Sequence, residues 1–327
     1  MQIYLLLTDD CNLKCSMCIR GNQIGKTLSF PTIKDMNWLS DLKEHDIVVT
    51  GGEPTMHPQF VSIVEYLCDY AKTVTVTTNG TMDYYLNKEF LRKNLYFQIS
   101  IDGDLETHNS IRGTGMYQKS MKTIRCLDNM DAQYSVASVV NKNNTEAMKA
   151  LEAELRGLNN IKYWRISYEM PFGSAGFENM MTADEWNGFV DEMIISAKLR
   201  IKIQKIFPFE IYERRKIDLD RIIEQNGRFN NCGSGKSKIY IYPDLQVYSC
   251  TCLTDFSLGS LKEYSLSEIL CGEEIHKFSN YKVKNKACID CEYLKYCNGG
   301  CIGMSYHYYG ELGMGDIRCP KLQPNEV

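Results

Sequence analysis

Three cysteines stand directly after the first apolar run of the chain, and this pattern constrains the fold more than any other feature. Residues 3–7 are apolar and are typical of a strand, and Cys11, Cys15 and Cys18 follow at CxxxCxxC spacing. Three thiolates on one loop can hold three irons of a [4Fe–4S] cube and leave the fourth iron without a protein ligand. Catalytic metal sites keep such an open position. On its own the triplet also suits a zinc loop, so the choice between zinc and an iron–sulfur cluster depends on the other motifs.

Composition excludes several classes of protein. The 37 basic and 41 acidic residues predict no broad field for nucleic acid. No apolar run approaches the ~18 residues of a membrane span, and the first residues lack the basic start of a signal peptide. We therefore expect a cytoplasmic protein without a membrane partner. In a reducing compartment, 14 cysteines favour metal binding or catalysis over disulfides.

The first two thirds of the chain alternate β-branched runs with helical periodicity, which predicts βαβ units and a parallel sheet. The expected strands are Gln2–Thr8, Asp46–Thr50, Thr73–Thr78, Tyr96–Ile101, Gln133–Val140 and Tyr163–Tyr168. Six such units form an α/β fold of the partial (β/α)6 TIM-type barrel kind, with a further helix at about Ala183–Leu199. Chemistry on a barrel lies at the carboxyl ends of its strands, where the cysteine triplet is found.

Polar and glycine residues mark the ends of the next expected strands. Gly51, Gly52, Glu53 and Pro54 follow the second strand, where glycine permits close backbone approach and a carboxylate can receive an ammonium group. The third strand ends at Asn79, which fits an Asn-Gly turn as well as a ligand contact. The residues of interest around the fourth strand end are Ser100, Asp102, His108 and Arg112. Loop capping is the competing explanation for Asp102 and His108, whereas an arginine suits bidentate binding of a carboxylate.

Cysteines crowd into the last part of the chain, and nine of the 14 lie in the final 96 residues. Helical periodicity fades near residue 226, so we predict one domain over 1–225 and a cysteine-rich domain over 226–327. The spacing Cys288-x2-Cys291-x5-Cys297-x3-Cys301-x17-Cys319 is the sharpest signal in the sequence, and Cys232, Cys250 and Cys252 precede it. Structural zinc is the alternative for such CxxC pairs. Cys68, Cys126 and Cys271 are expected to be core thiols.

These motifs together resemble those of the radical S-adenosylmethionine (radical SAM) superfamily with a C-terminal SPASM domain. The resemblance implies three [4Fe–4S] clusters and SAM as cofactors. It places the SAM-cleaving cluster on Cys11, Cys15 and Cys18, and SAM itself against Met17, Gly51, Gly52, Glu53, Pro54, Asn79, Ser100, Asp102 and Arg112. Auxiliary cluster I is expected on Cys232, Cys250 and Cys301, with its fourth position open or filled by Cys252. Auxiliary cluster II is expected on Cys288, Cys291, Cys297 and Cys319.

Three positions depart from this pattern. Met17 stands where the superfamily usually has an aromatic residue, and its polarizable side chain can still pack on adenine. Leu245 replaces the usual glycine of the hairpin before Cys250, where Asp244 should support the turn. Thr251 replaces the aspartate base that anaerobic sulfatase-maturating relatives carry. Cys252 is either a cluster ligand or a thiol that returns a hydrogen atom to a substrate radical.

The leading hypothesis is a radical SAM/SPASM enzyme that abstracts hydrogen from a peptide or protein substrate, leading to oxidation, crosslinking or epimerisation. With the first strand starting at residue 2, we expect no leader-recognition domain ahead of it, so a peptide would dock directly or through a partner. The alternative is the same chemistry on a small molecule, such as a sugar or an aminoglycoside-like alcohol. A remote alternative is a non-catalytic zinc or iron–sulfur module. Either enzyme would need an electron donor such as flavodoxin or ferredoxin.

Overall fold

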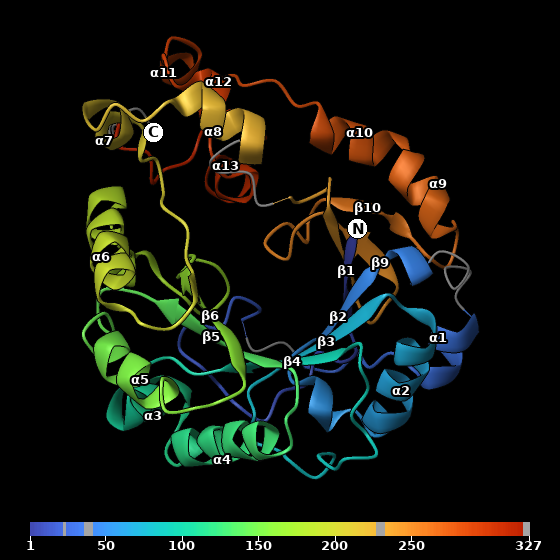
Figure 1. Ribbon diagram of the computed structural model, residues 1–327. Helices are drawn as coiled ribbons and strands as arrows, with labels where there is room; N and C mark the ends of the chain where they lie inside the picture. Colours follow the sequence, from blue (N-terminus) through green and yellow to red (C-terminus); the bar gives the residue numbers. More distant parts are fainter. Residues whose placement is uncertain (22–23, 36–41, 227–232, 323–327) are drawn as a thin grey trace.

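In the part of the chain that the structure describes, one curved sheet of ten strands organises the molecule. The computed structural model describes residues 1–21, 24–35, 42–226 and 233–322. The strand order is β10-β9-β8-β1-β2-β3-β4-β5-β6-β7, so the sheet has two edges and does not close into a barrel. Figure 1 shows the sheet curving around an interior, with the helices between β1 and β7 on its outer side.

The six expected parallel strands are confirmed, and their ends differ from expectation by at most two residues. They are β1 (Gln2–Leu6), β2 (Asp46–Thr50), β3 (Thr73–Thr78), β4 (Leu95–Ser100), β5 (Tyr134–Val140) and β6 (Ile161–Tyr168). A two-residue strand, β7 (Ile201–Lys202), extends the parallel sheet beyond β6. The structure therefore confirms the expected partial barrel.

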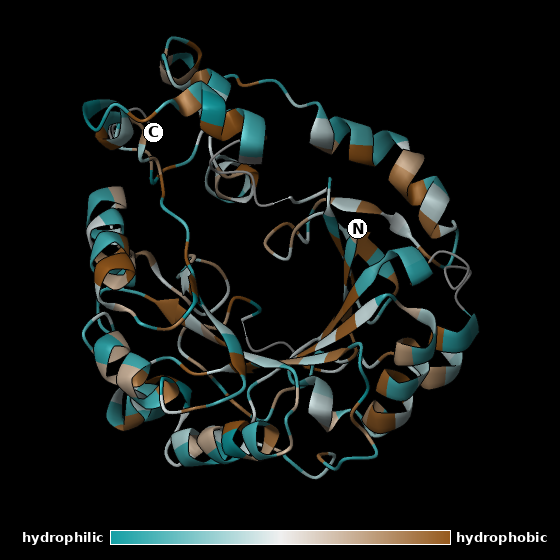
Figure 2. Cartoon of the chain, viewed as in Figure 1, coloured by the Kyte–Doolittle hydropathy of each residue, from teal (hydrophilic) through white to brown (hydrophobic). Residues whose placement is uncertain are grey.

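Alternation of side chains explains how these strands face both the core and the interior. In β3 and β4 every second residue is buried, including Val74, Val76, Phe97 and Ile99. Successive side chains of a strand point to opposite faces, so Thr75 and Gln98 lie on the other face. Figure 2 shows hydrophobic colour concentrated on the strands and hydrophilic colour on much of the outer helix surface.

The helices of the first two thirds cover the outer face of the sheet. They are α1 (Phe30–Asp35), α2 (Phe60–Tyr70), α3 (Leu105–Arg112), α4 (Met116–Asn129), α5 (Ala147–Leu155) and α6 (Ala183–Ser196). Three 3₁₀ turns accompany them, namely η1 (Leu42–Glu44), η2 (Pro54–Met56) and η3 (Phe177–Asn179). Helix α6 starts at a capping box of Thr182 and Glu185. It ends three residues earlier than the expected Leu199.

The cysteine-rich part continues the same sheet. Strand β8 (Lys238–Ile241) pairs in parallel with β1, and β9 (Gln246–Tyr248) and β10 (Ser257–Ser260) follow antiparallel. Two helices, α7 (Phe209–Arg214) and α8 (Leu219–Asn226), lead into this part, and its own helices are α9 (Leu266–Cys271), α10 (Glu273–Ser279), α11 (Lys286–Ile289), α12 (Leu294–Cys297) and α13 (Ile302–Tyr309). The boundary predicted at 225/226 falls at the end of α8.

The hairpin between β8 and β9 forms despite the missing glycine. Leu245 adopts a φ of 70°, the left-handed conformation in which glycine is usual. Asp244 accepts a hydrogen bond from the Gln246 N–H at 3.2 Å and so supports the turn as expected. Leu245 keeps its side chain buried, which offsets part of the conformational cost.

One expectation about the core thiols is wrong. Cys68 is buried and Cys126 is partly buried, but Cys271 is exposed. Cys271 is the last residue of the six-residue helix α9, whose buried residues are Leu266 and Ile269. At 3.6 residues per turn, Cys271 lies about 200° around the helix from Ile269 and therefore on the face opposite to the buried one.

Candidate functional site

The N-terminal cysteine loop lies at the carboxyl end of β1, beside the ends of β2 and β3. Cys11, Cys15 and Cys18 are all partly buried. The loop is held locally by hydrogen bonds from the Cys18 N–H to the Cys15 carbonyl at 3.2 Å and from the Gly21 N–H to the Cys18 carbonyl at 3.0 Å. Burial raises the pKa of the Cys11 thiol to about 11, against the hydrogen bond from the Leu13 N–H, which lowers it. Ligation of a metal would require these thiols to lose their protons.

Gly51 and Gly52 allow the end of β2 to pack closely against the backbone that follows β1. The Gly52 N–H donates to the Thr8 carbonyl at 2.7 Å, and the Glu53 N–H donates to the Asp10 carbonyl at 2.8 Å. A Cβ on Gly52 would lie 2.3 Å from the Asp10 carbonyl oxygen, and one on Gly51 would lie 2.4 Å from that of Thr8. The two glycines therefore allow the end of β2 to pack against the segment that leads into Cys11.

Glu53 lies beneath this loop and is 1% exposed. Its Oε1 accepts hydrogen bonds from the Thr55 N–H and hydroxyl and from the Thr78 hydroxyl, and its Oε2 accepts one from the Asn79 N–H at 2.7 Å. Burial raises the pKa of the Glu53 carboxyl, although the hydrogen bond from Asn79 and those from Thr55 and Thr78 lower it. Pro54 begins η2, and Glu53 caps that turn. An ammonium group would meet a carboxylate whose orientation is already fixed. Oε2 is the better acceptor for it, because Oε2 accepts one hydrogen bond and Oε1 accepts three.

Asn79 ties the end of β3 to the cysteine loop. Its side-chain amide donates to the Asn12 side chain at 2.9 Å, and its Oδ1 accepts from the Thr81 N–H at 2.9 Å. Gly80 has a φ of 71°, so the expected Asn-Gly turn is present. The same residue thus closes a turn and contacts the loop that carries the cysteines.

The end of β4 carries a buried ion pair. Asp102 has a side-chain exposure of 0% and pairs with the Arg112 guanidinium through Nε. Its other oxygen accepts from the Val139 N–H at 2.8 Å, and its own N–H donates to His108 Nδ1 at 3.1 Å. Burial raises the pKa of the Cys15 thiol, and the Arg112 charge lowers it, which places this pair beside the loop. Ser100, the last residue of β4, is partly exposed, and Met17 is buried.

Gly173 and Ser174 complete the support of the loop, and no motif of the sequence pointed to them. The Ser174 N–H donates to the Cys18 carbonyl at 2.8 Å. Gly173 has a φ of 68°, and a Cβ there would lie 2.3 Å from that same carbonyl oxygen. The one available signal was a glycine shortly after the sixth expected strand.

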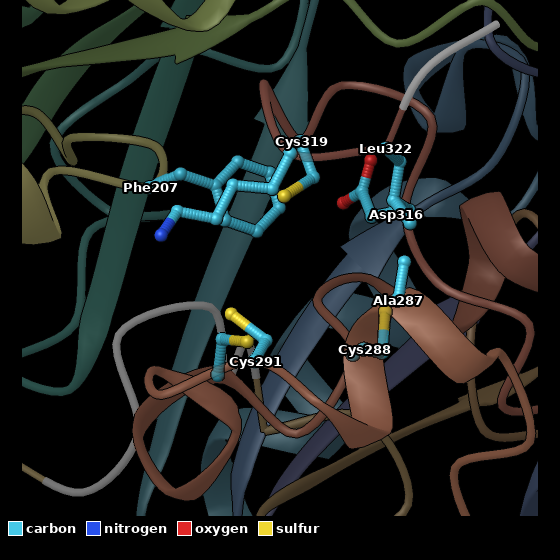
Figure 3. A pocket seen from close by; sticks show the side chains of 10 residues that line it. Phe207, Ala287, Cys288, Cys291, Asp316, Cys319 and Leu322 are labelled. Carbon is cyan, nitrogen blue, oxygen red and sulfur yellow. The ribbon is translucent and has the colours of Figure 1, made fainter.

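Four C-terminal cysteines line one pocket. Cys288, Cys291, Cys297 and Cys319 line a pocket of about 310 Å³, part of which is open to solvent, together with Phe207, Ala287, Gly299, Asp316, Lys321 and Leu322. Figure 3 shows Cys288, Cys291 and Cys319 around this space, with the Asp316 carboxylate at its edge. Burial raises the pKa of the Cys288 thiol to about 12 and that of Cys319 to about 11. Four thiols around an apolar hollow are the donor set that a [4Fe–4S] cluster takes.

A second group of cysteines meets around Gly303 of α13. A Cβ on Gly303 would lie 3.6 Å from Cys252 Cβ and from Cys301 Sγ, and 3.8 Å from Cys250 Sγ. Hydrogen bonding from Cys252 lowers the pKa of the Cys250 thiol to about 7, against the effect of burial. Cys232, expected in this group, lies outside the described residues. Across the described ranges, no three His, Cys, Asp or Glu side chains are close enough to hold a single metal ion.

Comparison with known proteins relates both cysteine regions to families. The sequence model of the radical SAM superfamily matches residues 5–151, and that of an iron-sulfur cluster-binding domain, SPASM, matches residues 232–292. The chain belongs to the radical SAM superfamily and carries a SPASM domain. These domains imply iron–sulfur clusters and binding of SAM.

Similar proteins include enzymes of different biosynthetic routes. The antilisterial bacteriocin subtilosin biosynthesis protein AlbA of Bacillus subtilis is 27% identical over 90% of this chain, which spans 65% of the length of AlbA. The AdoMet-dependent heme synthase of Methanosarcina barkeri is 23% identical over 93% of this chain and 92% of its own length. The structure of Streptococcus suis SuiB bound to precursor peptide SuiA matches with a TM-score of 0.79 and 17% identity, over 98% of this chain and 75% of SuiB. This last likeness supports the partial-barrel fold.

No helix of the described residues combines the length and the apolar character needed to cross a bilayer.

Proposed function

We propose that this protein is a radical SAM/SPASM enzyme that reductively cleaves SAM and uses the 5′-deoxyadenosyl radical to remove a hydrogen atom from a peptide or protein. The proposal rests above all on the three thiols of residues 11–18 at the carboxyl edge of the sheet, beside the fixed carboxylate of Glu53 and the Asp102–Arg112 pair. A site with three ligands leaves room for a substrate or cofactor at the metal.

Each part of the site has a distinct role in this proposal. Cys11, Cys15 and Cys18 hold the catalytic cluster, which, when bound, supplies the electron that breaks a carbon–sulfur bond of SAM. Glu53 Oε2 receives the amino group of SAM, and the guanidinium nitrogens of Arg112 that do not face Asp102 bind its carboxylate. Gly51, Gly52 and Pro54 shape the turn, while Met17, Asn79 and Ser100 contact the nucleoside. Asp102 orients Arg112 from within the sheet.

The C-terminal residues would hold two further [4Fe–4S] clusters, which makes three in all. Cys288, Cys291, Cys297 and Cys319 close one pocket with four thiols, and Cys250 and Cys301 belong to the other with Cys232. Cys252 lies with Cys250 and Cys301 around Gly303, a position that suits a ligand; hydrogen-atom return is its other candidate role. We assign residues 1–225 to SAM cleavage and 226–327 to the auxiliary clusters, with a flavodoxin- or ferredoxin-type electron donor.

The peptide substrate is supported by the relatives. AlbA takes part in making a bacteriocin, and SuiB was crystallised with a precursor peptide. A small-molecule substrate is the second candidate, because the heme synthase matches over 92% of its own length and so has nearly the same extent as this chain. In that case the alternatives include sugar-like alcohols, oxidised or epimerised by the same radical.

The test is release of 5′-deoxyadenosine by the anaerobically reconstituted protein with SAM and a reductant. Peptide and small-metabolite fractions of the source cell are added to separate reactions, and Cys15→Ala is the control. Stimulation by the peptide fraction, with a matching mass change in one peptide, is the expected result. Stimulation by the metabolite fraction alone would replace the peptide with a small molecule. A protein that takes up no iron would overturn the proposal as a whole.

A further inference from the structure

A buried ion pair near the end of the described chain joins Asp316 to Arg318. The Arg318 guanidinium donates to both carboxylate oxygens, from Nε to Oδ1 at 3.0 Å and from Nη2 to Oδ2 at 2.6 Å. The side-chain exposures are 0% for Asp316 and 8% for Arg318. Because a bidentate pair fixes both distance and orientation, these side chains have one preferred arrangement.

Asp316 contacts both groups of C-terminal cysteines. Its side chain lines the four-cysteine pocket, and its carbonyl accepts a hydrogen bond from the Cys319 N–H at 2.8 Å. Its Oδ2 also accepts a hydrogen bond from the Cys301 N–H at 3.0 Å, so the same carboxylate reaches the group around Gly303. One acidic residue therefore touches the backbone of a cysteine in each group.

Arg318 extends this connection to the parallel sheet. Its Nη1 lies 3.4 Å from Met170 Sδ, and its Cζ lies 5.2 Å from the centre of the Tyr168 ring. Tyr168 is the last residue of β6, and Met170 leads into Gly173 and Ser174, which pack on the Cys18 carbonyl. The pair thus stands between the auxiliary cysteines and the segment that supports the N-terminal loop.

The chemistry of the pair makes it suitable for tuning a cluster. Hydrogen bonds and net charge near a cluster set its reduction potential, and residues just outside the ligands orient them. In the intact pair the Asp316 charge at the pocket is balanced by Arg318. Loss of either partner leaves an uncompensated charge in a buried position, and the sign of that charge depends on which partner is removed.

We propose that Asp316 and Arg318 are positioning residues that join both groups of auxiliary cysteines to the end of β6, and that the Arg318 charge balances the Asp316 charge beside the four-cysteine pocket. This inference rests on the proposed function only in that clusters occupy those cysteines. It predicts opposite changes in reduction potential for the two single variants. Arg318→Gln leaves a negative charge and lowers the potential of the adjoining cluster, whereas Asp316→Asn leaves a positive charge and raises it.

The experiment uses the full chain in which Cys11, Cys15 and Cys18 are replaced by alanine, so that the spectroscopic signals arise from the C-terminal clusters alone. Potentials are measured by redox titration followed by electron paramagnetic resonance. The variants are Arg318→Gln, Asp316→Asn and the double variant, whose charge is again neutral and whose potential should return toward that of the parent. Arg318→Lys keeps the positive charge but loses the bidentate hydrogen bond to Asp316. It should therefore leave the reduction potential unchanged and weaken the retention of iron. Lys284→Gln is the matched control, since it removes a cation from an exposed pair with Glu311 in the same region.

Iron retention against a chelator provides a second readout. Loss of an outer partner typically weakens metal binding by about 10-fold or more, so Arg318→Gln and Asp316→Asn should release C-terminal iron at about 10-fold lower chelator concentration. Thermal unfolding by circular dichroism identifies any variant that fails to fold, and Arg318→Lys then carries the test. Shifts of the same sign in the single variants, or potentials equal to that of Lys284→Gln, would overturn the inference. A parent protein without C-terminal clusters would instead overturn the proposed function.

Discussion

The N-terminal cysteine loop and the C-terminal four-cysteine pocket differ in the number of their thiols and in the residues around them. In the N-terminal loop three thiols lie within eight residues, and the loop is supported by the ends of β2, β3, β4 and β6. In the C-terminal pocket four thiols come from a stretch of 32 residues, Cys288–Cys319, and the apolar side chains of Phe207, Ala287 and Leu322 line part of the space between them. Three ligands with polar neighbours suit a site that must admit a cofactor, and four ligands in an apolar hollow suit a site that is complete. The supporting contacts, more than the cysteines, distinguish the two.

The largest expected effect separates the two regions by function. Cys15→Ala should abolish release of 5′-deoxyadenosine and lower the iron content from ~12 to ~8 per chain, because one of the three proposed four-iron clusters would be lost. Cys297→Ala should instead disturb iron at the C-terminal pocket and leave slow SAM cleavage measurable. Iron analysis and product release by chromatography check both. Continued cleavage by Cys15→Ala would remove the assigned role of the loop.

The second prediction concerns the glycine that lets the loop form. Gly52→Ala should destabilise the protein by about 3 kcal/mol, because the added Cβ meets two backbone carbonyls that cannot turn away. Gly188→Ala is the control, since Gly188 is an exposed residue of α6 with no atom near a new Cβ. It should stabilise the helix by up to about 1 kcal/mol. Denaturant unfolding measures both, and equal effects would contradict the crowding at Gly52.

The third prediction concerns the stability of the N-terminal site at low pH. His108 is fully buried beside Asp102, and burial together with the Arg112 charge lowers its pKa from 6.5 to about 4. Between these two values the unfolded chain binds a proton that the folded chain does not, so stability falls as the pH decreases from 6.5 to about 4. His108→Asn should remove about 2–3 kcal/mol of this acid-dependent loss.

The exposed His276 supplies the control for that experiment, because His276→Asn changes a histidine on the surface of α10. Unfolding free energies are measured at pH 7 and pH 4.5 for the parent and both variants. If His108→Asn and His276→Asn show the same acid slope as the parent, the buried imidazole does not contribute to acid sensitivity.

The smallest effect is expected where the N-terminal loop touches the β8–β9 hairpin through Arg20. Arg20 pairs with the buried Asp9, and its Cζ lies 4.9 Å from the centre of the Tyr242 ring in the C-terminal part. A double-mutant cycle of Arg20→Gln and Tyr242→Leu should give a coupling energy of about 1 kcal/mol, the usual size of such a cation–ring contact. Additive effects in the cycle would show that the contact between Arg20 and the Tyr242 ring does not contribute to stability.

Local patterns were sufficient to predict much of the fold. The β-branched runs predicted six parallel strands correctly because each run is both a strong strand former and buried on at least one side. The pairing of β8 with β1 was not predictable, since it joins residues more than 230 positions apart and leaves no local periodicity. The exposed Cys271 shows a limit of such patterns for a short helix, because the face of α9 that is covered depends on the segments that pack against it.

The sequence by itself determined the barrel-type order of strands, and it supplied the candidate site residues through the spacing of the thiols and through the glycines and Glu53 after β2. Only the tertiary structure decided what holds those residues in place. It set Gly173 against the Cys18 carbonyl, matched Arg112 with Asp102, and placed the Asp316–Arg318 pair between both auxiliary cysteine groups and β6. The physical reason is that a motif is a property of neighbouring positions, whereas close packing and buried charge pairing depend on segments that meet only when the chain has folded.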